Sequence, residues 1–211
     1  MKKRFQYIRI SSLGLASLLM VLSFSGCKKF LDTQRQGEYA AEDYPYPGGA
    51  GPYDQFIFGA YNSLRNFDVH VFGFLHATSI RSDDADKGST PADGGANSLE
   101  MDNFPVSPTN GFANSLWTGY YGLINQCNNT IYEVNNNSEI EATEDIKQQT
   151  IAEARFIRGY AYFMLVRLYG RVPKIDTLYS DPGAQNNVPQ SLSAELYSFI
   201  VEDLNYAVNF L

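Results

Sequence analysis

The run of residues 153–170 constrains the fold more than any other part of this chain, because its apolar residues recur at helical spacing on two faces. One face carries Ala154, Ala161, Leu165 and Leu168, and the other carries Phe156, Tyr160, Phe163 and Arg167. A helix that covers a core from one side shows a single apolar stripe, so this helix is predicted to pack on two sides. Stacked helical pairs bury their helices in this way, and the sequence therefore favours an all-α fold of stacked pairs.

Gly159 stands in the middle of this predicted helix. Glycine destabilises a helix interior by about 1 kcal/mol relative to alanine, so a compensating contact is expected. Close approach of a neighbouring helix would provide that contact, and the alternative that Gly159 is only tolerated stays open. Gly170 and Pro173 end the helix, because glycine favours helix C-termini and proline cannot continue helical backbone.

Three other segments show helical patterns of apolar residues, and they cover residues 52–66, 114–134 and 193–211. Residues 68–80 predict a short helix or an irregular packed segment, and residues 181–190 predict a loop. Ser138-Glu139-Ile140-Glu141 matches a capping box, which predicts a helix start ahead of the long run. The last segment is still apolar at residue 211, so the chain is expected to be a fragment or a truncated product of a longer protein.

The first 26 residues have the pattern of a signal peptide. Basic residues precede an apolar run over residues 13–24, which is shorter than the roughly 20 residues of a membrane span. Ser25-Gly26-Cys27 then resembles a bacterial lipoprotein cleavage box, although Phe24 stands where such boxes more often carry Leu. Cleavage before Cys27 and acylation of its thiol are predicted. Ordinary signal cleavage that leaves Cys27 as a free thiol stays open.

Residues 27–51 are then expected to form a lipidated tether and an extended entry segment, because the Pro- and Gly-rich stretch 44–52 suits neither helix nor strand. Membrane attachment would come from the acyl chains, since the chain has 16 Lys and Arg against 23 Asp and Glu, a net charge of −7. Removal of the basic signal peptide makes the chain still more negative. A negative chain of this kind argues against nucleic acid as a partner.

The second cysteine, Cys127, falls on the apolar stripe of residues 114–134. A buried thiol that acts as a small hydrophobe is the predicted role, and a disulfide between Cys27 and Cys127 stays open as an alternative.

Residues 81–111 form a long polar insert with five aspartates. A loop of this length inside a compact region is usually functional or disordered. Asp84-Ala85-Asp86 suggests calcium ligands, but the EF-hand pattern fails at Gly88 and Gly95. An irregular oxygen-ligand site and a solvated loop with local Asp and Asn turns both stay open.

Catalytic and metal-binding patterns are weak. His70 and His76 lack a third ligand, so a packing or surface role is predicted for them and no metal site. The insert aspartates lack the apolar pocket that would raise the pKa of one carboxyl group for acid catalysis. With no nucleophile motif or phosphate loop in the sequence, neither an enzyme nor a cofactor is predicted.

Several stretches resemble the SusD/RagB family of outer-membrane nutrient-binding lipoproteins. They are Cys27-Lys28-Lys29-Phe30-Leu31-Asp32; Leu116-Trp117-Thr118-Gly119-Tyr120-Tyr121 with Ile124-Asn125-Gln126-Cys127-Asn128; Glu153-Ala154-Arg155-Phe156-Ile157-Arg158-Gly159-Tyr160 with Leu168-Tyr169-Gly170-Arg171-Val172-Pro173; and Ile200-Val201-Glu202-Asp203-Leu204. Each motif alone is weak, but together they span the chain in the family's order, which makes the resemblance specific.

The resemblance implies a tetratricopeptide-like scaffold of stacked helical pairs with long irregular loops, incomplete at the C-terminus. Residues 52–211 would be the N-terminal helical domain of a longer protein. The implied function is capture of oligosaccharides or other nutrients at the cell outer membrane. The protein would be lipid-anchored, face the exterior, and pass its ligand to a SusC-like TonB-dependent transporter. The alternative is a scaffold portion that docks on the transporter while ligand binding lies elsewhere.

In glycan-binding members of the family, part of the site lies on the loop before the second helix, which corresponds here to residues 81–111. By region only, the ligand candidates are Asp83, Asp84, Asn97 and Asp102. The insert contains no Trp, so no aromatic platform for a sugar ring is predicted there, and Trp117 is assigned to the core.

Two further expectations follow from the resemblance. The long helix 153–170 is expected to support loops and transporter docking without holding ligand. Asp176-Thr177-Leu178 resembles the short O-glycosylation motif of such bacteria, which predicts a glycan on Thr177.

Overall fold

The computed structural model describes residues 51–88, 90, 92–93, 95–178 and 183–211. The predicted signal peptide, the acylation site Cys27 and the tether 27–51 all lie outside the described residues, except for Gly51. The described part of the chain is helical, as predicted, with one isolated antiparallel bridge between Pro173 and Gln190.

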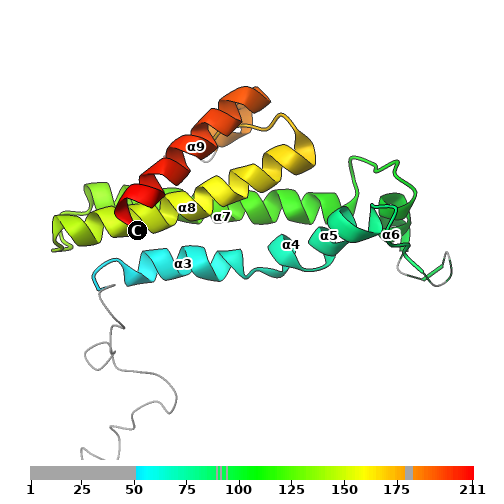
Figure 1. Cartoon of the computed structure of the whole chain (residues 1–211), viewed down its shortest axis with the longest axis horizontal. Helices are drawn as coiled ribbons and strands as arrows, with labels where there is room; N and C mark the ends of the chain where they lie inside the picture. The colour runs from blue at the N-terminus through cyan, green and yellow to red at the C-terminus, as the bar shows by residue number, and fades with distance from the viewer. Residues whose placement is uncertain (1–50, 89, 91, 94, 179–182) are drawn as a thin grey trace, which may run out of the picture. The chain divides into compact units, whose positions relative to one another are not determined.

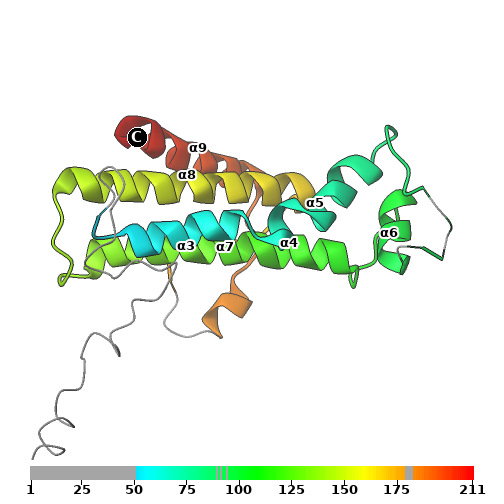
Figure 2. The same cartoon turned by 90° about the horizontal axis from the view of Figure 1, so that it is seen from below.

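Two long helices form the centre of the fold, α7 (Gly111–Asn136) and α8 (Glu144–Tyr169). They lie side by side and run in opposite directions (Figure 1). The helix α9 (Ser193–Phe210) packs on α8, and α3 (Asp54–Leu64) lies along both α7 and α8 (Figure 2). The long run predicted from the sequence is therefore a helix with neighbours on more than one side.

One of the two faces predicted for α8 is confirmed. Ala154, Ala161 and Leu165 are fully buried. The other predicted face packs against the core only at Tyr160, because Phe156 and Phe163 are 50% and 38% exposed.

The second packed face of α8 instead faces α9 and is formed by Arg158, Gly159 and Tyr162, all of them buried. A Cβ atom at Gly159 would lie 3.4 Å from Leu204 Cδ2 of α9, so the expected close approach of a helix is present. Arginine and glycine are not counted as apolar residues, so the apolar pattern does not predict this face and instead favours the aromatic residues beside it.

A buried ion pair holds this face together. Arg158 Nε and Nη2 donate to the two carboxylate oxygens of Asp203 on α9, each at 2.8 Å. Arg158 Nη1 donates to Asn128 Oδ1 of α7 at 2.8 Å, and Asn128 Nδ2 donates to the carbonyl oxygen of Ile175 at 3.0 Å. The network therefore joins three helices to the chain that follows α8, and it satisfies polar groups that would be costly to bury alone.

Tyrosine hydroxyls join the long helices to the short helix that contains Val69 and to the chain after α8. Tyr121 Oη of α7 donates to the carbonyl of Pro173 at 2.7 Å, and Tyr120 Oη donates to the carbonyl of Val69 at 3.2 Å. Tyr162 Oη of α8 donates to the carbonyl of Ile175 at 3.0 Å and accepts from the amide of the same residue at 2.6 Å. The position of the chain after α8 is thus set by side chains rather than by a sheet.

Helix starts differ from the predictions in two places. The capping box at Ser138 is not used, because Asn137 Oδ1 accepts from the amide of Glu139 at 3.1 Å in a local turn. Instead, α8 begins at Glu144, and the side chain of Thr143 accepts from the amide of Ile146. The start of α3 at Asp54 places Pro52 before the helix and not in its first turn.

The short segments contain more structure than predicted. Residues 68–80 are covered by α4 (Phe67–His70), α5 (Phe72–Leu75) and a π-helix, η1 (His76–Ile80). The polar insert contains α6 (Gly95–Asp102), and the predicted loop 181–190 contains a short 3-10 helix, η2 (Ala184–Asn187).

The core lies between α3, α7, α8 and α9. Cys127 is fully buried in it with a free thiol, as predicted for a small hydrophobe. Burial raises the pKa of this thiol to about 12. Among the described residues, no helix is both long enough and apolar enough to cross a bilayer.

Candidate ligand-binding cleft

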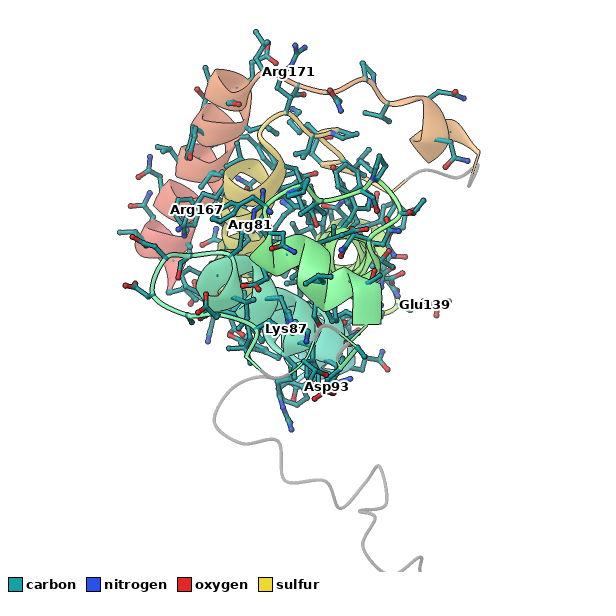
Figure 3. The ribbon with its side chains drawn as sticks, turned by 90° about the vertical axis from the view of Figure 1, so that its right-hand side faces the viewer. Arg81, Lys87, Asp93, Glu139, Arg167 and Arg171 are labelled. Atoms are coloured by element: carbon teal, nitrogen blue, oxygen red, sulfur yellow. The ribbon has the colours of Figure 1, made fainter. Side chains whose placement is uncertain are left out.

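A cleft of about 610 Å³ opens at the end of the helical stack where the polar insert meets α7 and α8. Its walls come from η1, from α6, from residues 106–108, from the first two turns of α7 and from the last turn of α8. Figure 3 looks onto this end of the molecule and labels Arg81 and Arg167, which both line the cleft. Side chains with aromatic or hydrogen-bonding groups on its walls are Arg81, Ser107, Asn114, Trp117, Arg167 and Tyr169.

Two aromatic residues form one wall. The rings of Trp117 on α7 and Tyr169 on α8 meet edge to face, with centroids 5.2 Å apart. Tyr169 Oη donates to the carbonyl of Ala113 at 2.6 Å, and burial raises the pKa of this phenol to about 12. The hydroxyl therefore stays protonated at neutral pH and keeps the ring in place. An indole and a phenol on a concave surface offer the faces on which sugar rings stack.

Asn110 holds the insert against the start of α7. It is buried, and its side-chain oxygen caps α7 by accepting from the amides of Phe112 and Ala113. Its amide nitrogen donates to the carbonyl of Asn97 and to Glu100 Oε2. Asn110 therefore connects α6 to α7 and fixes the side of the cleft that the insert provides.

Glu100 orders the loop on the same side. Its Oε2 accepts from Asn110 and from both the amide and the hydroxyl of Ser107, each at about 3.0 Å. The hydrogen bond from Asn110, followed by those from Ser107, lowers the pKa of this carboxyl group. Glu100 is thus ionised and already partnered, and it presents Ser107 to the cleft.

The two arginines of the cleft are held differently. Arg81 Nη1 donates to the carbonyl of Phe104 at 2.7 Å, and its guanidinium lies 5.3 Å from the centroid of that ring. Phe104 has φ 74°, a conformation uncommon for a residue with a side chain, so this hydrogen bond supports an unfavourable backbone. Arg167 is exposed and lies over the ring of Phe163 at 5.1 Å.

None of the four residues predicted by region lines this cleft. Asp83 and Asp84 are exposed. Asn97 Oδ1 accepts from the amide of Gly111 at 2.9 Å, and Asp102 Oδ1 accepts from the amide of Lys87 at 3.2 Å. Asn97 and Asp102 therefore shape the insert, which gives them a structural role.

Sequence reasoning missed the residues that do line the cleft. The sequence predicts a core position for Trp117, which packs partly against the core and also lines the cleft. The end of α8, which was expected to hold no ligand, contributes Arg167 and Tyr169 to the walls. No local pattern marks these residues, because the cleft exists only where segments distant in sequence meet.

A smaller cleft of about 330 Å³ shares Trp117 with the larger one. Tyr121, Asn125, Ile175 and Val188 also line it. The ring of Tyr121 lies 4.9 Å from the indole. Trp117 therefore stands between two hollows on the same side of α7.

The histidines pack against aromatic rings. His76 stacks on Phe112 with ring centroids 4.2 Å apart, and His70 lies 5.5 Å from the ring of Phe74. Burial lowers the pKa of His70. Within the described ranges, no group of three or more His, Cys, Asp or Glu side chains could hold a metal ion.

Comparison with known proteins identifies the family. Residues 74–211 match a family, SusD-like, that is described as starch-binding and associating with the outer membrane. A SusD-like protein P2 from Formosa agariphila is 32% identical over 155 residues, which cover 74% of this chain and 30% of that protein. The chain thus spans less than a third of the length of this relative.

Solved structures agree with this match. A laminarin-binding SusD-like protein is 26% identical with a TM-score of 0.64, and the match covers 75% of this chain and 33% of that one. A crystal structure with a xylogluco-oligosaccharide is also 26% identical, with a TM-score of 0.58, covering 75% of this chain and 30% of that one. The match to the family covers more than half of the residues of this chain, so the chain belongs to the SusD-like family.

Proposed function

We propose that this protein captures oligosaccharides at the outer membrane and passes them to a SusC-like TonB-dependent transporter. It is held at the membrane, facing the exterior, by acyl chains on Cys27. Binding without catalysis is the proposed activity, because the described residues of the larger cleft include no carboxylate. Glycoside hydrolysis uses a pair of carboxylates on either side of the scissile bond.

The observation that carries this proposal is the larger cleft itself. It combines the aromatic rings of Trp117 and Tyr169 with hydrogen-bonding side chains such as Asn114 and Ser107. Sugar rings are recognised by this combination, because their C–H faces stack on aromatic rings while their hydroxyls exchange hydrogen bonds with polar side chains. The oligosaccharide-bound and laminarin-binding relatives support the same ligand class.

A second candidate function is docking on the transporter alone, with ligand binding elsewhere in a longer protein. Aromatic side chains exposed on α4, α5 and α8 favour it, since unpaired apolar surface suits a protein partner. These side chains include Phe67, Phe72 and Phe156, each at least 50% exposed. Co-purification of a large β-barrel protein from outer membranes tests this docking.

Affinity electrophoresis through gels that contain polysaccharides tests the capture of glycans. We expect at least one polysaccharide to retard the protein and Trp117→Ala to remove the retardation. Tyr132→Ala is the matched control, because Tyr132 is an exposed aromatic residue of α7 that does not line the cleft. Retardation that persists in Trp117→Ala would place the glycan elsewhere.

Metabolic labelling with a fatty-acid analogue tests the anchor. Cys27→Ala is expected to abolish labelling and to release the protein from the membrane fraction, because acylation supplies the membrane affinity. Cys127→Ala should remain labelled, since the thiol of Cys127 is buried in the core. Labelling of Cys27→Ala at the wild-type level would refute the lipoprotein assignment.

A further inference from the structure

We propose that the larger cleft selects oligosaccharides with an anionic substituent, a carboxylate or a sulfate group, and that Arg81 and Arg167 recognise this substituent. This inference rests on the proposed function and narrows its ligand class.

The charge of the cleft is opposite to that of the chain. The chain has a net charge of −7, yet Arg81 and Arg167 line the cleft and no Asp or Glu among the described residues lines it with them. Guanidinium groups stay protonated at any physiological pH. Two like charges in one concave site raise the local potential, so an anion is attracted there even though the whole molecule would repel it.

Both arginines retain unused hydrogen-bonding capacity. A guanidinium has five N–H donors, and Arg81 uses one of them for the carbonyl of Phe104. The described contact of Arg167 is with the ring of Phe163, and no hydrogen bond of its N–H donors is found among the described residues. Neither arginine takes part in the ion pairs found among the described residues. The planar fork of such a group matches the oxygens of a carboxylate or a sulfate.

Neighbouring carboxylates do not neutralise the arginines by contact. Asp83 and Asp84 follow Arg81 in the sequence, but they are exposed and lie outside the cleft. Among the described residues, neither forms an ion pair with Arg81. Glu100 accepts hydrogen bonds from Ser107 and Asn110. The positive charge of the cleft is therefore available to a ligand.

The aromatic wall completes the arrangement. Trp117 and Tyr169 form an aromatic wall, and Arg81 and Arg167 line the same cleft. A ring stacked on this wall would thus have a guanidinium within the same site to receive a charged substituent. A neutral glycan would use the wall and leave both arginines without a counter-charge.

Pairs of polysaccharides that share one backbone test the proposal. We would measure binding of the complete chain to dextran sulfate against dextran, and to galacturonan against its methyl ester. The charged member of at least one pair is expected to bind about tenfold tighter or more, since charge-assisted hydrogen bonds exceed neutral ones. A preference confined to the first pair identifies sulfate, and one confined to the second identifies carboxylate. Added salt should reduce the preference by screening.

Variants test whether the two arginines cause the preference for the charged glycan. Arg167→Gln should lower the affinity for the charged glycan about tenfold and leave that for its uncharged partner unchanged. Arg167→Lys should retain part of the preference, since it keeps the charge but loses the fork. Arg171→Gln is the matched control, because Arg171 is exposed and does not line the cleft (Figure 3). Arg81→Gln tests the second group, and circular dichroism checks that this variant keeps its helix content, because Arg81 also bonds to Phe104.

The outcomes separate this inference from the function on which it rests. Equal binding of charged and uncharged partners, lost in Trp117→Ala, would overturn the inference and leave glycan capture intact. An equal loss of charged-glycan binding in Arg167→Gln and Arg171→Gln would also overturn it, because the effect would then be one of net charge. Failure of every glycan to bind would overturn both proposals.

Discussion

Arg158 and Asp203 are the residues on which the packing of α8 against α9 depends. Their side chains are 5% and 0% exposed, and two parallel hydrogen bonds of 2.8 Å join them. Burial alone would lower the pKa of the guanidinium, but the hydrogen bonds and the charge of Asp203 more than offset it and raise the pKa. The pair is therefore charged inside the core, and each member is costly to leave without the other.

Replacement of Asp203 by Asn should lower the free energy of unfolding by about 3–5 kcal/mol, because it leaves the Arg158 charge buried without a counter-charge. Urea denaturation measures this loss. Glu202→Gln is the control, since the Glu202 side chain is 70% exposed, and its effect should stay below about 0.5 kcal/mol. A loss in Asp203→Asn no larger than in this control would show that the pair is not structurally required. Replacing both partners by Met and Leu should cost less than the single change.

At the scale of the helices, the space around three glycines shows how closely neighbouring helices approach. A Cβ atom at Gly119 of α7 would lie 3.1 Å from the backbone carbon of Asp68 and from Val69 Cγ2. At Gly159 of α8 the nearest atoms of α9 would lie at 3.4–3.5 Å, which is ordinary contact, and at Gly122 nothing lies within 4 Å. The α4–α7 contact is thus tighter than the α8–α9 contact.

Substitution of these three glycines by alanine should destabilise the protein more, the closer the neighbouring atoms lie. Gly122→Ala should stabilise the protein by up to about 1 kcal/mol, since only helix propensity changes. Gly159→Ala should fall within about 1 kcal/mol of wild type. Gly119→Ala should destabilise by about 1–3 kcal/mol, because the backbone of α4 must move. Thermal unfolding of the three variants measures the order, and equal effects would mean that α4 does not press on α7.

Prediction from the sequence succeeded for the helices but did not find the residues that line the larger cleft, for a physical reason. The helices around Trp117, Arg158 and Leu196 repeat apolar residues over many turns, and that signal is local. The cleft brings together Arg81, Trp117 and Arg167 from segments up to 86 residues apart in the chain, so only the folded arrangement places them in one wall. Polar residues of the insert were visible in the sequence, but Asn97 and Asp102 bond to the insert and to the start of α7.

At the scale of the whole molecule, buried and partly buried tyrosines are expected to make the fold sensitive to alkali. Burial raises the pKa of Tyr169 to about 12, and it also raises the pKa values of Tyr120, Tyr121 and Tyr162. These hydroxyls remain protonated in the folded protein at a pH where an unfolded chain already loses its phenolic protons. Their contribution to stability is full below about pH 10 and is lost as the pH rises toward 12.

The urea midpoint is therefore expected to be constant between pH 7 and 9 and to fall steadily above pH 10. Denaturation curves at a series of pH values, followed by far-ultraviolet circular dichroism, measure it. Tyr169→Phe should show a smaller fall, since it removes one of the groups whose pKa is raised. A midpoint that stays unchanged up to pH 11 would contradict the assignment of these tyrosines as buried, protonated groups.

Trp117 belongs to both clefts, and it is the single tryptophan among the 211 residues. Its indole thus makes the protein a spectroscopic sensor of its own site. Excitation at the red edge of the absorption band selects this one side chain, and its emission depends on how much water reaches the ring. A ligand in either hollow should displace water and shift the emission to shorter wavelength. Titrations can therefore follow occupancy without a label.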